Sequence, residues 1–161
     1  MKKTNLSAQS SIPVPRPICI GIVVSEWNEQ VTEALKEGAV SFLLEQGVTQ
    51  KEIITHYVPG SFELPLGAGM MLDENEKMDG VICLGCVIQG ETRHFEFISQ
   101  SVADGVMRVG LDYGVPVVFG VLTCDTMEQA LDRSGGKHGN KGVEAAATVL
   151  KMINLQRNLK R

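Results

Sequence analysis

The residues best suited to chemistry lie in one short polar turn, from Gln89 to His94, at the end of an apolar run. The run Gly80–Ile88 has strand character, and a helical pattern begins directly after the turn. Backbone N–H groups at a helix start bind anions, and an imidazole titrates near neutral pH and can move protons. This order of residues indicates an enzyme site of the α/β type, to which Thr92 and His94 contribute.

The elements that must position this turn alternate between strand and helix. The run Ile18–Val24 is apolar on both faces, as in a fully covered parallel strand, whereas Lys51–Val58 alternates more and fits a strand nearer an edge. The pattern predicts an open parallel sheet of four strands with helices on both faces, of flavodoxin-like type. The remaining predicted elements are strands at Gly80–Ile88 and Val115–Leu122, helices at Gln30–Gln46, Leu66–Glu74, Phe95–Tyr113 and Val143–Asn158, a short helix from Thr126 to Leu131, and a loop at Arg133–Gly142.

The length of 161 residues fits a single domain, which we place at 17–161. Residues 1–16 are polar and carry Pro13 and Pro15, and Pro17 follows directly, which excludes a helix or a central strand. We expect an extended N-terminal arm with few partners in its own domain. Two states remain open for this arm: disorder, or pairing along a neighbouring subunit.

Composition excludes several classes of partner. The net charge of −4 does not favour nucleic acid, and no apolar run approaches the roughly 20 residues that span a bilayer. The first residues are too polar for a signal peptide, so we expect a cytoplasmic protein.

The cysteines predict neither a metal site nor a disulfide. Cys83 and Cys86 form a C-x-x-C pair, but residues three apart in a strand point to opposite faces and cannot easily share one metal. Cys19 and Cys124 also lie in or beside strand-like runs. We expect all four to be buried, reduced thiols.

Ligands of such sheets bind beyond the carboxyl ends of the strands. Aromatic residues are only 5% of the chain, yet Trp27 and Phe62 both follow strands, which suggests stacking on a flat heterocycle. Structural alternatives exist: Trp27 could cover the sheet end, Glu63 could serve a helix dipole, and Thr92 and His94 could cap a helix. Their shared location at one edge favours a site.

The stretch from Asp132 to Lys141 carries cations and glycines without a large apolar residue. It does not match the Walker A spacing. Arg133 is its best anion ligand, because a guanidinium offers a planar fork of donors.

These motifs together resemble the lumazine synthase family of riboflavin biosynthesis, over roughly Pro17 to Asn158. The segments that carry the resemblance are Trp27-Asn28, Pro59–Pro65, Gly85–His94, Phe119–Thr126 and Gln129–Gly142. The resemblance implies condensation of 5-amino-6-ribitylaminouracil with 3,4-dihydroxy-2-butanone 4-phosphate to 6,7-dimethyl-8-ribityllumazine, phosphate and water, with no metal or organic cofactor.

The resemblance also implies a role for each site residue. Trp27 would stack on the pyrimidine, and His94 would occupy the proton-transfer position. The phosphate-binding turn would contain Glu91 and Thr92. The pocket for ribitylaminouracil would be lined by Ser61, Phe62, Glu63, Cys86, Val87 and Ile88, and the adjacent subunit would supply Phe119, Arg133 (on the phosphate) and Lys141.

Two departures from the family pattern are visible. Trp27 stands where Phe is usual, and Glu91 stands where many relatives have a small residue. A carboxylate beside a phosphate site is unfavourable unless it points outward.

Family members are homopentamers, and some form shells of sixty subunits. The short loop Gly135–Gly142 resembles the shell-forming branch, which we favour, while the prolines of the arm resemble some members that stop at pentamers. A flavin or nucleotide carrier and a cage with a purely structural or storage role are the alternative functions. A flavin or nucleotide carrier requires a hydroxyl-rich phosphate-binding loop after the first strand, and Ser25–Asn28 fits this requirement poorly.

Overall fold

The two most apolar strands form the centre of the sheet. In the computed structural model, which describes residues 11–160, β1 (Ile20–Ser25) and β3 (Gly80–Ile88) are flanked by β2 (Ile53–Val58) and β4 (Val117–Cys124). All pairs are parallel, in the order β2-β1-β3-β4. β1 is buried at every position, whereas β2 is partly exposed at the edge. The predicted four-stranded flavodoxin-like sheet is therefore confirmed.

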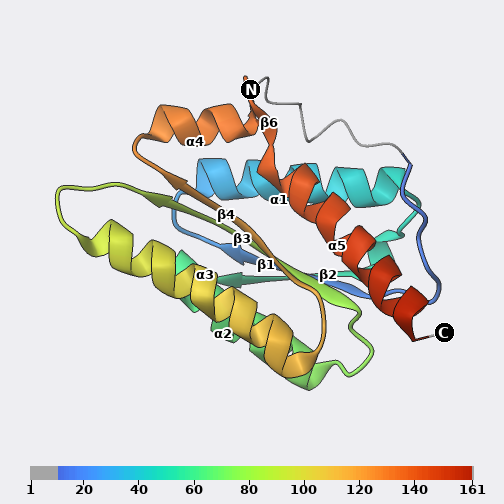
Figure 1. Cartoon of the computed structure of the whole chain (residues 1–161). Coiled ribbons are helices and arrows are strands. Elements are labelled where there is room, and N and C mark those ends of the chain that lie inside the picture. The colour runs from blue at the N-terminus through green and yellow to red at the C-terminus, as the bar shows by residue number, and fades with distance from the viewer. Residues whose placement is uncertain (1–10, 161) are drawn as a thin grey trace.

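Helices cover both faces of the sheet (Figure 1). α1 (Glu29–Glu45) and α5 (Lys141–Leu159) pack on one face, and α2 (Leu64–Glu74) and α3 (His94–Tyr113) pack on the other. Each face has its own apolar core, and the residues of β3 alternate between the two.

The stretch predicted as a loop at 133–142 is instead largely ordered structure. Arg133 ends α4 (Met127–Arg133), a small hairpin of β5 (Ser134–Gly136) and β6 (Gly139–Asn140) follows, and Lys141 already begins α5. The side chain of Asn140 caps α5, because its Oδ1 accepts from the N–H groups of Gly142 (2.8 Å) and Val143 (3.3 Å). Because of this cap, α5 begins at Lys141, two residues before Val143, where the apolar pattern begins.

Smaller differences in bounds have local causes. Lys51 and Glu52 lie in a 3₁₀ turn, η1 (Gln50–Glu52), rather than in β2. α2 begins at Leu64, two residues before the predicted start, with Pro65 in its first turn, where a missing N–H costs nothing. β4 begins and ends two residues later than predicted, after Pro116.

Residues 11–16 pack on the domain itself. Ile12 is buried in the core beside α1 and α5, and its N–H donates to Gln46 Oε1 at 2.7 Å. Asn154 Nδ2 donates to the Pro13 carbonyl at 2.7 Å, and Arg16 pairs with Glu52. The expectation of few partners in the same domain is therefore wrong for this segment, while residues 1–10 lie outside the described part of the chain.

All four cysteines are free thiols. Cys83 and Cys86 face the two different cores, as predicted, and burial raises the pKa of each to about 12. Cys124 is buried as well. Cys19 is only half-buried, contrary to the prediction, because it precedes β1 at the sheet end, where Asn75 Nδ2 reaches its Sγ at 3.6 Å. Within residues 11–160, no helix has the length and apolar character needed to cross a membrane.

Candidate functional site

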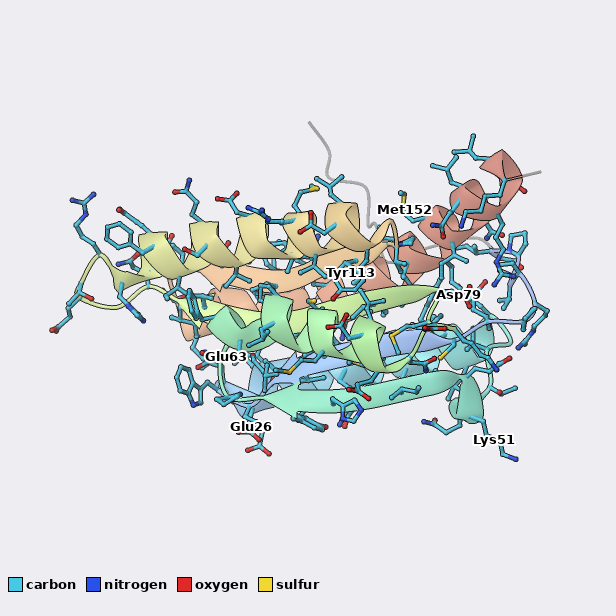
Figure 2. All side chains as sticks on the ribbon, turned by 90° about the horizontal axis from the view of Figure 1, so that it is seen from below. Glu26, Lys51, Glu63, Asp79, Tyr113 and Met152 are labelled. Atoms are coloured by element: carbon cyan, nitrogen blue, oxygen red, sulfur yellow. The ribbon has the colours of Figure 1, made fainter. Side chains whose placement is uncertain are left out.

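The loops that follow β1 and β2 are joined into one structure, which we call the β1–β2 corner (residues 26–28 and 59–63). The strands pair up to Ser25 and Val58, and the bonding continues beyond them. The N–H of Glu26 donates to Val58 O at 2.8 Å and that of Trp27 to Pro59 O at 3.1 Å. Figure 2 shows Glu26 and Glu63 at this end of the sheet, opposite Asp79 and Lys51.

Trp27 rests on the backbone of Gly60. A Cβ at Gly60 would lie 2.6 Å from Trp27 Cε3, so a glycine is required for this approach. Glu63 Oε2 accepts from the Gly60 N–H at 3.0 Å and so also holds this residue in place. The Trp27 side chain is still 65% exposed and that of Phe62 56% exposed, so both rings are accessible to a ligand.

Ser61 anchors the corner to the sheet rather than facing the ligand space. It begins the 3₁₀ turn η2 (Ser61–Glu63), is only 6% exposed, and lies against Gly85 of β3. A Cβ at Gly85 would be 2.5 Å from Ser61 Oγ and 2.8 Å from Leu64 Cδ1. The absence of a side chain at Gly85 therefore lets η2 sit directly on β3, with Phe62 and Glu63 at its outer end.

Cys86, Val87 and Ile88 lie beside a gap between β1 and β3. The β1–β3 ladder ends at Val24 and Leu84, while β3 stays paired with β4 up to Ile88. Burial falls along these three residues, from buried Cys86 to half-buried Val87 and Ile88. The central strands thus separate at the position where α/β sheets bind ligands.

The β3–α3 turn (residues 89–93) is exposed and is held mainly by its own residues. Gln89 Nε2 donates to the carbonyls of Gly90 (2.7 Å) and Thr92 (3.3 Å), and Thr92 Oγ1 accepts from the His94 N–H at 3.4 Å. Glu91 and His94 are both exposed. Within residues 11–160, no hydrogen bond or ion pair joins this turn to Trp27 or Glu63.

Phe119 and Lys141 lie on a different surface. Phe119 pairs with Cys83 near the start of β4, five residues before the strand ends at Cys124, or about 17 Å at roughly 3.3 Å per residue. Both residues line a groove of about 820 Å³ along the outer edge of β4, between α3 and α5. The exposed apolar side chains in this groove include Met107, Leu111, Met152, Leu155 and Leu159.

Arg133 ends α4, and its guanidinium donates back to the Gln129 carbonyl at 2.9 Å. Its charge lies near Cys124, where it opposes the larger effect of burial, which raises the pKa of that thiol. One chain therefore does not bring Phe119, Arg133 or Lys141 into contact with Trp27 or His94.

Asn28 lies in the motif Trp27-Asn28, but the sequence did not indicate a role for its side chain. Its Nδ2 donates to the Cys86 carbonyl at 2.9 Å, across the gap between β1 and β3. The available signal was an asparagine in the turn three residues after a buried strand, because asparagine tolerates the left-handed conformation of turns.

The arrangement supports a specific chemistry. The corner offers exposed rings for a flat heterocycle and a carboxylate for polar groups. The turn offers backbone N–H groups at a helix start for an anion and an imidazole for proton transfer.

Comparison with known proteins agrees with this chemistry. The model of the 6,7-dimethyl-8-ribityllumazine synthase family matches residues 17–157. A 6,7-dimethyl-8-ribityllumazine synthase of Cytophaga hutchinsonii is 57% identical over 150 residues, covering 92% of this chain and 94% of that protein. Proteins with the same name from Porphyromonas gingivalis (50% identical, 91% of each chain) and Parabacteroides distasonis (48%, 90% of each chain) are also similar. The chain therefore belongs to the 6,7-dimethyl-8-ribityllumazine synthase family.

Proposed function

We propose that the carboxyl end of this sheet condenses 5-amino-6-(D-ribitylamino)uracil with 3,4-dihydroxy-2-butanone 4-phosphate. The products are 6,7-dimethyl-8-ribityllumazine, phosphate and water, in the penultimate step of riboflavin biosynthesis. The observation that carries this proposal is the exposed Trp27 ring held on Gly60 beside Glu63, at the same end of the sheet at which the β1–β3 ladder stops at Val24 and Leu84.

The β1–β2 corner binds the pyrimidine substrate. Trp27 stacks on the uracil ring, and Phe62 lines the ribityl chain. Gly60 donates to Glu63 Oε2, and the Glu63 carboxylate keeps further lone pairs, including those of Oε1, to accept from the ligand. The main chain of 86–88 borders the ring edge, because the β1–β3 ladder leaves it without a partner in β1. Ser61 contributes by holding η2 against β3.

The β3–α3 turn binds the phosphorylated ketone. The backbone N–H groups of Glu91 and Thr92, in the turn just before the 20-residue helix α3, hold the phosphate. Arg133 of a neighbouring subunit adds a planar fork of donors on the phosphate oxygens. Because Glu91 is exposed, its carboxylate can point into solvent while its N–H stays in the site.

His94 moves the protons of the reaction. The aromatic amine of one substrate adds to the ketone of the other and loses water to give an imine. Loss of a proton from the adjacent carbon allows phosphate to leave, and the ribityl-bearing nitrogen then closes the ring with loss of water. An imidazole suits such transfers, with a contribution of about 10²–10⁴-fold, and positioning of two substrates supplies further acceleration.

The active form is a homopentamer, in which Phe119, Arg133 and Lys141 complete the site of the next subunit. Twelve pentamers build the sixty-subunit shell. Support comes from the groove along β4, where Phe119 and Lys141 share a surface with exposed Met107, Leu111 and Met152. An apolar groove of this kind is typical of a surface covered in an assembly.

The test is a steady-state assay of lumazine formation with both substrates, combined with negative-stain microscopy. We expect product to form only when both substrates are present, and particles to be rings or closed shells. Absence of product from an assembled wild-type protein would refute the proposed activity, and active monomers would refute the shared site.

A further inference from the structure

Asn28 is the residue at which β1 turns into α1, and its backbone conformation is unusual. Among residues 11–160 it is the one non-glycine residue with a positive φ, at 61° with ψ at 43°. Asparagine is among the residues that best tolerate this left-handed conformation. Its carbonyl accepts from the N–H groups of Val31 (2.9 Å) and Thr32 (3.1 Å), so α1 starts from this residue.

The side chain of Asn28 does not cap α1, although the residue occupies the N-cap position. It reaches across to β3 instead, where Nδ2 lies 2.9 Å from the Cys86 carbonyl oxygen. A carbonyl can only accept, so the amide nitrogen must face it. A role in helix capping therefore does not explain the orientation of this side chain.

This hydrogen bond spans the gap between the central strands. The β1–β3 ladder ends at Val24 and Leu84, and Cys86 lies two residues beyond its end. The Asn28 amide therefore supplies a donor to a carbonyl that has no β1 residue opposite it. It continues the connection between β1 and β3 at the position where the two chains separate.

Trp27 lies between a contact with the loop after β2 and a residue, Asn28, that is bonded to β3. On one side its N–H donates to Pro59 O at 3.1 Å and its ring packs on Gly60, which ties it to the β2 loop. On the other side the next residue, Asn28, is tied to β3. We propose that Asn28 is a positioning residue: its amide hydrogen bond to the Cys86 carbonyl fixes the position of the neighbouring Trp27 relative to the Cys86 main chain of β3.

The inference deepens the proposed function, because the ring and the main chain of 86–88 are the two surfaces between which the pyrimidine is to lie. A loose β1–α1 turn would let the ring shift relative to β3. Binding of the pyrimidine substrate would then weaken, while the phosphate turn and His94 would be unaffected. The effect is therefore expected in KM for the pyrimidine rather than in kcat.

Two substitutions separate the backbone from the side chain. Asn28→Gly keeps the left-handed conformation and removes the amide, whereas Asn28→Asp keeps the shape and sets a carboxylate oxygen against the carbonyl. Asn154→Asp is the matched control, since Asn154 Nδ2 also donates to a carbonyl, that of Pro13, away from the site. Trp27 is the only tryptophan, so its fluorescence reports the ring directly.

We expect both Asn28 variants to raise KM for 5-amino-6-(D-ribitylamino)uracil about tenfold, as for loss of one hydrogen bond, with kcat and the KM of the ketone nearly unchanged. Trp27 fluorescence anisotropy should fall, and quenching of Trp27 by the pyrimidine alone should need about tenfold more ligand. Asn154→Asp should match wild type in all these measurements.

Wild-type anisotropy and wild-type pyrimidine affinity in both Asn28 variants would overturn the positioning role. An Asn28→Gly variant that behaves as wild type while Asn28→Asp is impaired would also overturn it, because the amide bond would then be dispensable. Failure of the proposed function is distinguishable, since wild-type protein would then form no lumazine and show no quenching by the pyrimidine.

Discussion

The β1–β2 corner and the β3–α3 turn lie at the same end of the sheet but differ in how they are built. In the corner, Trp27 is fixed by a backbone hydrogen bond and by Gly60, and η2 is seated on Gly85. In the turn, the side-chain bonds of Gln89 and Thr92 stay within the turn and the first residue of α3, one backbone bond joins Gln89 N–H to Cys124 O at 2.9 Å, and His94 is exposed.

This difference teaches how one chain can supply half of a site. In the proposed function the corner recognises a rigid flat ring, so we expect its contact surfaces to be preorganised by one subunit. In the proposed function the turn handles phosphate and protons with help from a neighbouring subunit, since within one chain Arg133 bonds its own helix and Phe119 lies near the start of β4. Changes in the turn should therefore alter turnover or phosphate use, and changes in the corner should alter stability and pyrimidine binding.

The largest effect is expected at His94. His94→Ala should lower kcat by about 10²–10⁴-fold through loss of the proton-transfer group, while thermal stability stays unchanged because the side chain is exposed. Quenching of Trp27 by the pyrimidine should persist. His56→Ala, on the exposed outer strand β2, is the matched control and should retain wild-type kcat. A kcat close to wild type for His94→Ala would remove His94 from the reaction.

Substitutions at Gly85 and Gly90 test whether the β1–β2 corner is packed more rigidly than the β3–α3 turn. Gly85→Ala places a Cβ 2.5 Å from Ser61 Oγ, and we expect the free energy of unfolding to fall by about 1–3 kcal/mol. Gly90→Ala is the control in the turn, where a Cβ would meet nothing within 4 Å, and its effect should be within about 0.5 kcal/mol. Urea denaturation at one protomer concentration measures both. Equal losses for the two variants would contradict the rigid corner.

The smallest effect is expected at Glu91. Glu91→Gln removes a negative charge beside the proposed phosphate site and should lower KM for the phosphorylated ketone by about two- to fivefold at low salt, with less change at high salt. Glu76→Gln, an exposed change in the turn before β3 at the other end of the sheet, should leave this KM unchanged. A raised KM for Glu91→Gln would show that the carboxylate contributes to the site.

Apolar patterning predicted the parts of the fold that depend on burial. The strands Gly80–Ile88 and Ile20–Ser25 were identifiable because nearly every position is apolar, as a doubly covered strand requires. The start of α5 was not identifiable from the sequence. It is set by the Asn140 cap and by contact of Gly142 with Leu35, and these features leave no local apolar pattern. The packing of Ile12 on the domain was missed for the same reason.

The site was predictable as a set of motifs but not as a geometry. The position of Trp27 and Glu63 after adjacent strands follows from the sheet order, so their proximity could be anticipated. The bond from Asn28 to Cys86 could not, because it depends on where the β1–β3 ladder ends. The buried position of Ser61 likewise depends on Gly85, which the sequence presents only as one residue of a strand.

The central claim is that His94 of one subunit works with Arg133 of another. Arg133→Ala alone should raise KM for the phosphorylated ketone about 10- to 100-fold, through loss of hydrogen bonds to a charged group. The most direct test is subunit complementation, in which His94→Ala and Arg133→Ala chains are coexpressed with different tags and co-purified. Activity is then measured at low concentrations of the ketone, where each variant alone is nearly inactive.

In a random mixture, about a quarter of the interfaces join an intact His94 to an intact Arg133 of the neighbour, so activity should return to about that fraction of wild type. If Arg133 acted in the site of its own chain, every mixed site would still lack one group. No recovery in co-purified mixed assemblies would therefore contradict the shared site.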